Sequence, residues 1–244
     1  MIALLPGGGY AQYAKVHKDH TIDVPKDVEL KLASGLTEVY ATAFQILHLV
    51  AHAKAGETIL VHAAASGVGT ALLTLAKKAG LTTIAVASQD DKLEVCKSLG
   101  AAKVINYKNT PEFQEEVLLF TDGKGVDIVA DPVGASNAAR NVASLAKDGR
   151  WVLYGFLGGA AIENFDLRPL LMKRISLLVT ALKSRSNDYK RDLLKQVGEA
   201  VFENETLQVK PFIDTTFPMS KASECHSYME QNTSIGKALL EVDL

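Results

Sequence analysis

The sequence predicts an α/β fold built around a parallel, doubly wound sheet. Between about residues 55 and 180, short apolar runs alternate with stretches that have helical periodicity, and this alternation is typical of a parallel sheet with helices on both faces. A segment of small residues follows the first apolar run and opens the first helix. The chain has 244 residues, of which 48% are hydrophobic and 22% are charged, so it can bury a substantial core in one large domain or two small ones.

The expected strands are compact apolar runs, as buried parallel strands usually are. They lie at residues 58–63, 82–87, 103–107, 126–131, 150–155 and 176–180. Stretches with apolar residues at helical spacing separate them, and two of these stretches stop at a glycine, as helices often do. The expected helices are residues 67–79, 91–99, 111–121 and 137–145.

The two ends of the chain follow a different pattern, because short strand-like runs are expected in both. These runs are residues 10–16, 21–25, 208–213 and 237–242, and two helices, residues 37–51 and 188–202, connect them to the middle. Strands this short need partners. The ends are therefore predicted to form one discontinuous domain from residues 1–34 and 205–244, and residues 35–204 are predicted to form the sheet domain.

Composition and charge argue against several classes of partner. The formal net charge is −2, which gives no bulk attraction to nucleic acid or to anionic membranes. No apolar run approaches the ~20 residues of a membrane-spanning helix, and the start of the chain lacks the basic segment of a signal peptide. The protein is therefore expected to be cytoplasmic. Cys96, Cys225 and the six histidines show no spacing typical of a metal site.

The segment between the first strand and the first helix carries the clearest functional motif. Against the dinucleotide-binding pattern G-x-G-x-x-G it reads Ala64-x-Ser66-x-x-Gly69, and Gly67 and Val68 stand between. Small residues are required there because the backbone passes close to a pyrophosphate, which the free N–H groups at the helix N-terminus then bind. The motif follows a strand and opens a helix, as a Rossmann fold requires. A tight turn without a ligand is the simpler alternative.

The end of the second strand favours NADP(H) over NAD(H). NAD-dependent enzymes usually place an Asp or Glu there to bind the ribose 2′-hydroxyl, whereas this chain has the neutral Ser88, followed by Lys92. Asp90 and Asp91 oppose this interpretation, because a carboxylate beside a 2′-phosphate would repel it. Their effect is small only if they cap the second helix and point to solvent.

Several longer segments resemble one protein family. They resemble the zeta-crystallin-like quinone oxidoreductases, which are a branch of the medium-chain dehydrogenase/reductase superfamily. The segments are His62–Ala71, Leu99–Ala102, Ile105–Lys108 and Asp148–Gly155. Four further segments resemble a subgroup of NADPH:quinone reductases within this branch. They are Ala3–Gly9, Ser184–Ser186, Tyr228–Glu230 and Ile235–Lys237.

The resemblance implies a GroES-like β domain on the substrate side, of which this chain holds a remnant. In the family, the segment similar to Ala3–Pro6 lies near the end of that domain, so a truncation, an alternative start or an incomplete gene model is expected. The family's polar residues near the quinone belong to the missing part. The resemblance therefore assigns no catalytic residue in this chain.

The resemblance does assign contacts to the cofactor. It implies that Lys92 and Tyr107 contact the 2′-phosphate and the adenosine. It places Thr42 beside the nicotinamide, and the loop Gly155-Phe156-Leu157 along the nicotinamide pocket. Asn232 stands where some relatives have an arginine, so this chain is expected to hold the cofactor phosphate less tightly at that position. An ordinary helix threonine and a plain turn glycine are the alternatives for Thr42 and Gly155.

The resemblance also implies an enzyme that works without zinc. Glu38 stands where zinc-dependent relatives place a cysteine ligand, and Pro6–Gly9 stands where they carry a four-cysteine lobe. The expected reaction is hydride transfer from NADP(H) to a small-molecule quinone. Reduction of enones or enoyl thioesters is an alternative within enzymes, and a non-catalytic chain that binds NADPH or a partner subunit is an alternative outside them.

An expectation about assembly follows from the same resemblance. The family is commonly dimeric, with two nucleotide-binding sheets joined edge to edge. The sixth expected strand, Ser176–Thr180, would be the pairing strand here. A homodimer through this edge is therefore expected.

Overall fold

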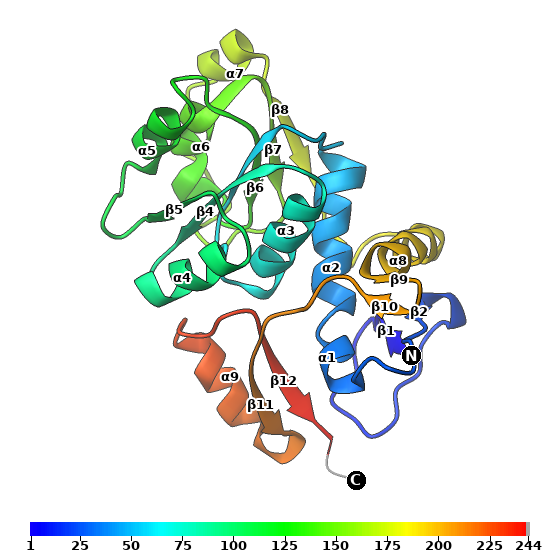
Figure 1. Ribbon diagram of the computed structural model, residues 1–244. Coiled ribbons are helices and arrows are strands. Elements are labelled where there is room, and N and C mark those ends of the chain that lie inside the picture. The colour runs from blue at the N-terminus through cyan, green and yellow to red at the C-terminus, as the bar shows by residue number, and fades with distance from the viewer. Residues whose placement is uncertain (243–244) are drawn as a thin grey trace. The chain divides into compact units, whose positions relative to one another are not determined.

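The computed structural model in Figure 1 describes residues 1–242. The chain divides into two compact units. One unit combines residues 1–43, 66–71 and 182–244, and we call it the terminal unit. The other combines residues 44–65 and 72–181, and we call it the sheet unit. Each unit is described by itself below.

The sheet unit contains a six-stranded parallel sheet with the order β5-β4-β3-β6-β7-β8. Its strands are β3 (Thr58–Val61), β4 (Thr82–Ala87), β5 (Lys103–Asn106), β6 (Val126–Asp131), β7 (Leu145–Leu153) and β8 (Ser176–Val179). The strand order moves outward from β3 to β5, returns to β6 and then moves outward in the other direction to β8. This is the order of a doubly wound Rossmann sheet, so the predicted fold class is confirmed.

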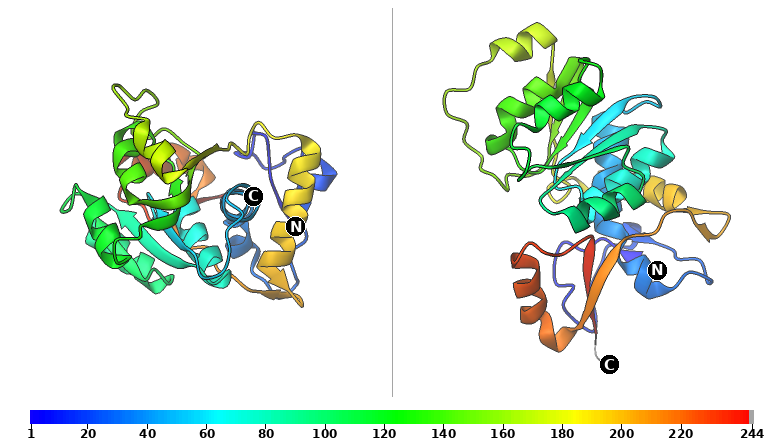
Figure 2. Two further views of the ribbon diagram at one scale, coloured as in Figure 1. Left: turned by 90° about the horizontal axis from the view of Figure 1, so that it is seen from above. Right: turned by 60° about the vertical axis from the view of Figure 1, so that its left-hand side comes forward.

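Helices connect the strands of this sheet. They are α3 (Gly67–Lys78), α4 (Asp90–Ser98), α5 (Phe113–Phe120), the 3₁₀ turn Ala135–Asn137, α6 (Ala138–Ser144) and α7 (Arg168–Lys173). Right-handed crossovers place α4 and the pair α5–α6 on opposite faces of the sheet. The views in Figures 1 and 2 show α5 and α6, in green, next to each other.

A cluster of buried apolar side chains holds the sheet to α5 and α6. The strands contribute aliphatic residues together with Trp151, and the helices contribute Phe113, Val117, Ala138 and Val142. A fully buried aliphatic or aromatic side chain contributes about 1.5–3 kcal/mol relative to an exposed one. The central strands are buried on both faces, which explains why their sequences are continuous apolar runs.

The terminal unit is assembled from both ends of the chain. Near the N-terminus, β1 (Ile2–Ala3) pairs antiparallel with β2 (Thr21–Ile22), which follows the 3₁₀ turn Lys18–His20, and the helices α1 (Leu30–Ser34) and α2 (Thr37–Phe44) come next. The helix α2 continues into a π-helix, Gln45–Val50, in the sheet unit. The long helix α8 (Asn187–Val201) buries one face through Leu193, Leu194, Val197 and Val201.

The C-terminal part of this unit is a separate two-layer motif. The strands β9 (Phe202–Glu203) and β10 (Thr206–Leu207) form a hairpin. The strand β11 (Ile213–Pro218) then pairs in parallel with β12 (Lys237–Glu241), and the 3₁₀ turn Met219–Lys221 and α9 (Ala222–Glu230) connect them. No helix of residues 1–242 has the length and apolarity needed to cross a membrane.

The predicted elements of the terminal unit are corrected in two places. Residues 10–16 do not form the expected strand, and Tyr10 and Tyr13 are exposed, because no strand of the described chain pairs with this segment. The strand expected at 208–213 instead lies at Ile213–Pro218, since Pro211 cannot donate to a ladder. The helix α9 was not expected, because its hydrophobic residues show no clear helical period.

Candidate functional site

The turn between β3 and α3 begins with a left-handed residue. Ala63 has φ 47°, a conformation that non-glycine residues rarely adopt. The next residue, Ala64, is fully buried, and its backbone N–H donates to the carbonyl of Val86 at 3.0 Å. Ala64 therefore continues the hydrogen bonding between β3 and β4 beyond the end of β3, and a larger side chain would not fit at this position.

The next residues, Ser66–Ala71, belong to the terminal unit. Ser66 begins α3, since its Oγ accepts from the N–H of Gly69 at 3.1 Å and its carbonyl accepts from the N–H of Thr70 at 2.8 Å. A Cβ on Gly67 would lie 2.9 Å from the Lys237 side chain and 3.0 Å from the Val39 side chain. A side chain at Gly67 would therefore require Lys237 and Val39 to shift. Val68 is half-buried and Gly69 is buried.

The carboxyl ends of β4 and β5 bring three predicted cofactor residues to one edge of the sheet. Ser88 follows β4 and is 7% exposed, and Lys92 in the first turn of α4 is 5% exposed. Tyr107 follows β5, is partly exposed, and donates its backbone N–H to the carbonyl of Ala87 at 3.1 Å. The three residues thus lie where doubly wound sheets bind nucleotides.

The two carboxylates beside Ser88 are engaged with the protein. Asp91 Oδ1 accepts from the backbone N–H of Lys92 at 2.7 Å, and Asp90 Oδ1 accepts from the Asn106 side-chain amide at 2.8 Å. Both residues are exposed at the N-terminus of α4, where negative charge is favourable. Asp91 bonds within the first turn of α4, whereas Asp90 bonds to Asn106 at the end of β5, so neither carboxylate side chain is without a partner.

The loop after β7 is held against the loop after β6. Leu157 donates its N–H to the carbonyl of Pro132 at 3.0 Å, and Gly158 donates to the carbonyl of Val133 at 2.7 Å. A Cβ on Gly155 would lie 2.8 Å from the Pro132 carbonyl oxygen, so the close approach requires glycine there. Phe156 and Leu157 remain exposed, which leaves an apolar surface at this edge of the sheet.

A buried polar network supports these two loops, and the sequence interpretation missed it. Asp131 ends β6 with no exposed surface, and its carboxylate accepts from the Trp151 indole N–H at 2.9 Å and from the Asn141 amide at 2.9 Å. It also accepts from the backbone N–H groups of Val133 and Gly134 at 2.7 and 3.1 Å. A carboxylate that directly follows the apolar run Ile128–Ala130 is the sequence signal that could have revealed it.

His62 joins the same network. One ring nitrogen lies 2.7 Å from Asn141 Oδ1, and the ring packs edge-on against Phe113. Burial lowers the pKa of His62, and it outweighs the opposing effect of the Asp131 carboxylate. The histidine is therefore a core residue.

The terminal unit holds the other two predicted cofactor residues. Thr42 on α2 is buried, and its hydroxyl donates to Glu38 Oε1 at 3.1 Å, one turn earlier on the same helix. Asn232 is exposed and left-handed with φ 54°, and its N–H donates to the carbonyl of Met229 at 3.0 Å. Asn232 therefore ends α9 in the way that Asn and Gly commonly end helices.

The residues of the described chain do not fit a zinc site. No group of three or more His, Cys, Asp or Glu side chains that could hold a metal ion occurs in residues 1–242. Cys96 lies in the sheet unit and Cys225 in the terminal unit, and both are buried. Burial raises the pKa of the Cys96 thiol to about 12, so this side chain remains a thiol rather than a thiolate ligand.

Comparison with known proteins assigns the family. A family model described as "Zinc-binding dehydrogenase" matches residues 67–204, more than half of the chain. The chain belongs to this family. Within the zinc-binding dehydrogenases, it is 31% identical over 246 residues to a 2-haloacrylate reductase of Burkholderia sp, and the match covers 97% of this chain and 72% of the relative. The human quinone oxidoreductase is 27% identical, with 96% of this chain and 69% of the relative covered.

Solved structures agree with this assignment. A mycobacterial protein complexed with NADPH superposes with a TM-score of 0.84 at 28% identity, over 96% of this chain and 72% of the other. An NAD-dependent alcohol dehydrogenase superposes with a TM-score of 0.79 at 28% identity, over 97% of this chain and 66% of the other. The chain is thus a quinone-oxidoreductase-like member of the medium-chain dehydrogenase/reductase superfamily of oxidoreductases, as predicted.

Proposed function

We propose that the chain binds NADPH and reduces quinones or electron-poor alkenes. The observation that supports NADPH is that the neutral Ser88 and the cationic Lys92 both lie at the end of β4. The neighbouring carboxylates of Asp90 and Asp91 accept hydrogen bonds from Asn106 and from the backbone of Lys92. The relatives named as quinone oxidoreductases and as a 2-haloacrylate reductase support the class of acceptor. Both acceptors are conjugated and electron-poor.

In this proposal the protein binds and orients, and NADPH supplies the hydride when bound. The N-terminus of α3 offers backbone N–H groups to the pyrophosphate. Lys92 pairs with the 2′-phosphate, Ser88 leaves room for it, and Tyr107 contacts the adenosine. The resemblance implies that Thr42 contacts the nicotinamide, and it implies a separate contact from the loop Gly155–Leu157. Water supplies the proton that the reduced acceptor takes up.

The cofactor proposal is tested with a matched pair of variants on one helix. Lys92→Gln should weaken NADPH binding by about 10–100-fold, the size of a lost hydrogen bond to a charged group, and leave NADH binding unchanged. Lys97→Gln, at an exposed lysine of α4 that pairs with Glu94, should change neither. Calorimetric titration of each variant with both cofactors measures this. Equal losses for NADPH and NADH in Lys92→Gln would contradict the 2′-phosphate role.

Turnover is a separate test. The wild-type chain should oxidise NADPH in the presence of a quinone, measured as loss of absorbance of the reduced nicotinamide. Tight NADPH binding without turnover would favour the non-catalytic alternative instead.

We also propose a homodimer through β8. This strand pairs with β7 on one side only, and Leu177 and Val179 on one of its faces are 50% and 66% exposed. An exposed apolar edge strand is a site at which another strand can pair. Val179→Lys should shift the protein toward monomers in light scattering, and Leu119→Lys, at an exposed leucine of α5, should not. A Val179→Lys protein of unchanged mass would exclude this strand as the interface.

A further inference from the structure

A cavity of about 900 Å³ lies in the terminal unit, and all of the residues that line it belong to that unit. Its apolar wall consists of Leu4, Leu5, Pro6, Val16 and Leu182. This volume is far larger than a small inorganic ion needs, and it lies within the range of sites for organic molecules, about 300–1,000 Å³. The cavity can therefore hold a ligand that has an apolar body.

The charges around the cavity are strongly unequal. Among the described residues that line it, one is an acid, Glu38, and four are lysines: Lys15, Lys18, Lys183 and Lys190. None of these lysines forms a salt bridge within residues 1–242, and Glu38 accepts a hydrogen bond from the Thr42 hydroxyl at 3.1 Å. The chain as a whole carries a net charge of −2, so this excess of positive charge is local and raises the concentration of anions there.

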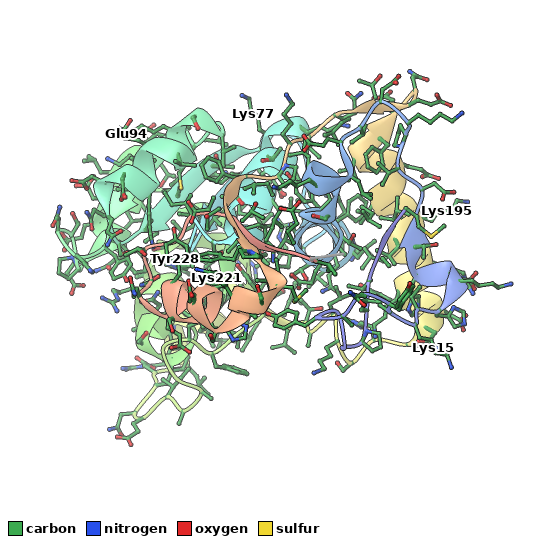
Figure 3. The ribbon with its side chains drawn as sticks, turned by 90° about the horizontal axis from the view of Figure 1, so that it is seen from below. Lys15, Lys77, Glu94, Lys195, Lys221 and Tyr228 are labelled. Carbon is green, nitrogen blue, oxygen red and sulfur yellow. The ribbon has the colours of Figure 1, made fainter. Side chains whose placement is uncertain are left out.

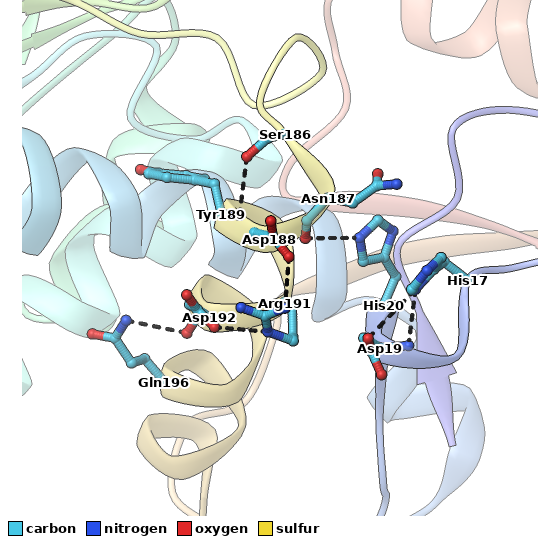
Figure 4. A network of polar contacts seen from close by, with 10 residues as sticks. All are labelled: His17, Asp19, His20, Ser186, Asn187, Asp188, Tyr189, Arg191, Asp192 and Gln196. Atoms are coloured by element: carbon cyan, nitrogen blue, oxygen red, sulfur yellow. Dashed lines mark hydrogen bonds and ion pairs between the residues drawn. The ribbon is translucent and has the colours of Figure 1, made fainter.

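Two segments supply these lysines, and a hydrogen bond joins the segments. The first two lysines precede β2, and the last two flank the start of α8. A ring nitrogen of His20 lies 3.3 Å from the carbonyl oxygen of Asn187, the first residue of α8, as Figure 4 shows. The Lys190 ammonium donates to the backbone carbonyl of Lys183 at 2.9 Å. Both pairs of lysines are therefore held at the same cavity.

The acidic residues next to these segments have other partners. Figure 4 shows Arg191 between Asp188 and Asp192 on α8, at 2.6 and 2.9 Å. The carboxylate of Asp19 lies 3.8 Å from His17, which lines the cavity. The wall also includes the first residue of α8, where the helix dipole is positive. The lysines therefore remain the dominant charges of the wall, and the dipole adds to them.

We propose that this cavity binds a single-chain amphiphile that has a phosphate-monoester headgroup and a saturated apolar tail. The lysines bind the phosphate, and the apolar wall covers the tail. A phosphate monoester carries a charge of about −1.5 to −2 at pH 7 and offers three acceptor oxygens, so it can engage several ammonium groups at once. The ligand takes no hydride and undergoes no reaction in the cavity. The inference is therefore independent of the proposed function.

Three probes separate the contributions of headgroup and tail. Hexyl phosphate, inorganic phosphate and heptanoate are titrated into the full chain by calorimetry at pH 8, where the monoester is a dianion. We expect hexyl phosphate to bind at least tenfold more tightly than inorganic phosphate, since burial of about two methylene groups is enough for this. It should bind about threefold more tightly than heptanoate, whose tail is matched but whose headgroup has one charge. Equal affinity for hexyl phosphate and either of the other probes would overturn the proposal.

A double variant locates the headgroup in the cavity. Lys15→Gln with Lys183→Gln removes one exposed charge from each segment and should weaken the binding of hexyl phosphate by about fivefold. Lys195→Gln is the matched control and should change nothing, because Lys195 is an exposed lysine of α8 that does not line the cavity. Figure 3 labels Lys15 and Lys195. Wild-type affinity in the double variant would place the phosphate elsewhere and overturn the proposal.

A variant of the apolar wall locates the tail. Val16 is half-buried, and Val16→Ser should weaken the binding of hexyl phosphate by about threefold while that of inorganic phosphate stays unchanged. The unchanged phosphate binding also shows that the variant is folded. Equal losses for the two ligands, or no loss for either, would overturn the placement of the tail. All of these titrations are made without NADPH and without a quinone, so their outcome does not depend on whether the chain is a reductase.

Discussion

The molecule contains two parallel β-structures that differ in burial. In the six-stranded sheet, the central strands β3 and β6 are buried over nearly their whole length. In the two-stranded pair of β11 and β12, all residues of β11 are only half-buried. Parallel strands are normally covered on both faces. The two sheets share the parallel hydrogen-bonding pattern but differ in burial. Their stabilities therefore cannot be compared from the hydrogen-bonding pattern alone.

Side-chain contacts supply what the smaller sheet lacks in burial. Asp214 on β11 accepts from the Tyr228 hydroxyl on α9 at 2.5 Å and from the N–H of Ile235 at 3.1 Å. One carboxylate thus ties β11 to the helix and to the segment before β12. In the large sheet, Asp131 has a similar role, but it is fully buried. The same type of network is therefore expected to stabilise the buried sheet more than the half-buried one.

The largest expected effect is the loss of the buried carboxylate. Asp131→Ala leaves the Trp151 indole, the Asn141 amide and two backbone N–H groups without their acceptor. We expect the free energy of unfolding to fall by about 4 kcal/mol. Urea denaturation followed by fluorescence measures it directly, because Trp151 is the only tryptophan.

Asp131→Asn is the control for this variant, because it keeps one acceptor oxygen. We expect it to lose about half as much free energy. If Asp131→Ala unfolds at the same urea concentration as the wild type, the network does not stabilise the sheet. The expected difference in stability between the two sheets would then be contradicted.

A glycine pair tests the smaller sheet. Gly236 precedes β12 with φ +67°, and a Cβ there would collide with the carbonyl oxygen of Phe212. Gly56 has φ +87° but no atom within 4 Å of such a Cβ. Gly236→Ala should cost about 2–3 kcal/mol, the sum of a clash and a disfavoured φ, and Gly56→Ala about 1 kcal/mol from φ alone.

Hydrogen exchange distinguishes the two glycine variants by region. Gly236→Ala should accelerate exchange in β11 and β12 and leave β3 and β6 protected. Equal acceleration in both sheets would show that they open as one unit.

Acidification should act on the sheet unit through His62. Burial lowers the pKa of this histidine, so the unfolded chain binds a proton near pH 6.5 that the folded chain does not. Stability is then complete above pH 6.5 and falls below it, by up to about 1.4 kcal/mol per pH unit. His48 adds to this slope, because burial lowers its pKa as well.

His62→Gln should flatten the slope between pH 7 and pH 5, and urea midpoints across this range measure it. His226→Gln, in the terminal unit, is the control. A slope that is unchanged in His62→Gln would mean that the folded and unfolded states protonate this histidine equally.

The smallest expected effect belongs to the hydroxyl that ties α9 to β11. Tyr228→Phe removes the hydrogen bond to Asp214 and should cost about 1 kcal/mol. The bond to the carboxylate raises the pKa of Tyr228 to about 12, so its contribution is present at neutral pH and is lost as the pH rises from about 10 toward 12. Faster exchange of β11 alone would confirm the assignment, and an unchanged protein would contradict it.

The sheet unit could be predicted from the sequence more fully than the terminal unit. The runs 82–87 and 126–131 match β4 and β6 to the residue, because buried strands are continuous apolar segments. At the ends of the chain, residues 10–16 have strand-like composition, yet Tyr13 is 91% exposed. Whether a short run becomes a strand depends on a partner, and composition does not reveal the partner.

The candidate site shows the same division. Ser88, Lys92 and Tyr107 lie at the carboxyl ends of adjacent strands, and their placement follows from the order of the strands in the sequence. The Asp131 network could not be predicted in this way. It joins residues of β6, α6 and β7, and their contacts depend on the register between these elements.

The position of Asp131 has a consequence for how the protein can diverge in evolution. This one carboxylate stabilises the core and also fixes the loop that holds Gly155–Leu157 in place. Substitutions of Asp131 that would change this loop also destabilise the fold. Selection for stability is therefore expected to remove them, whatever their effect on activity. Related proteins are therefore expected to keep the backbone of this loop and to vary at its exposed side chains, Phe156 and Leu157.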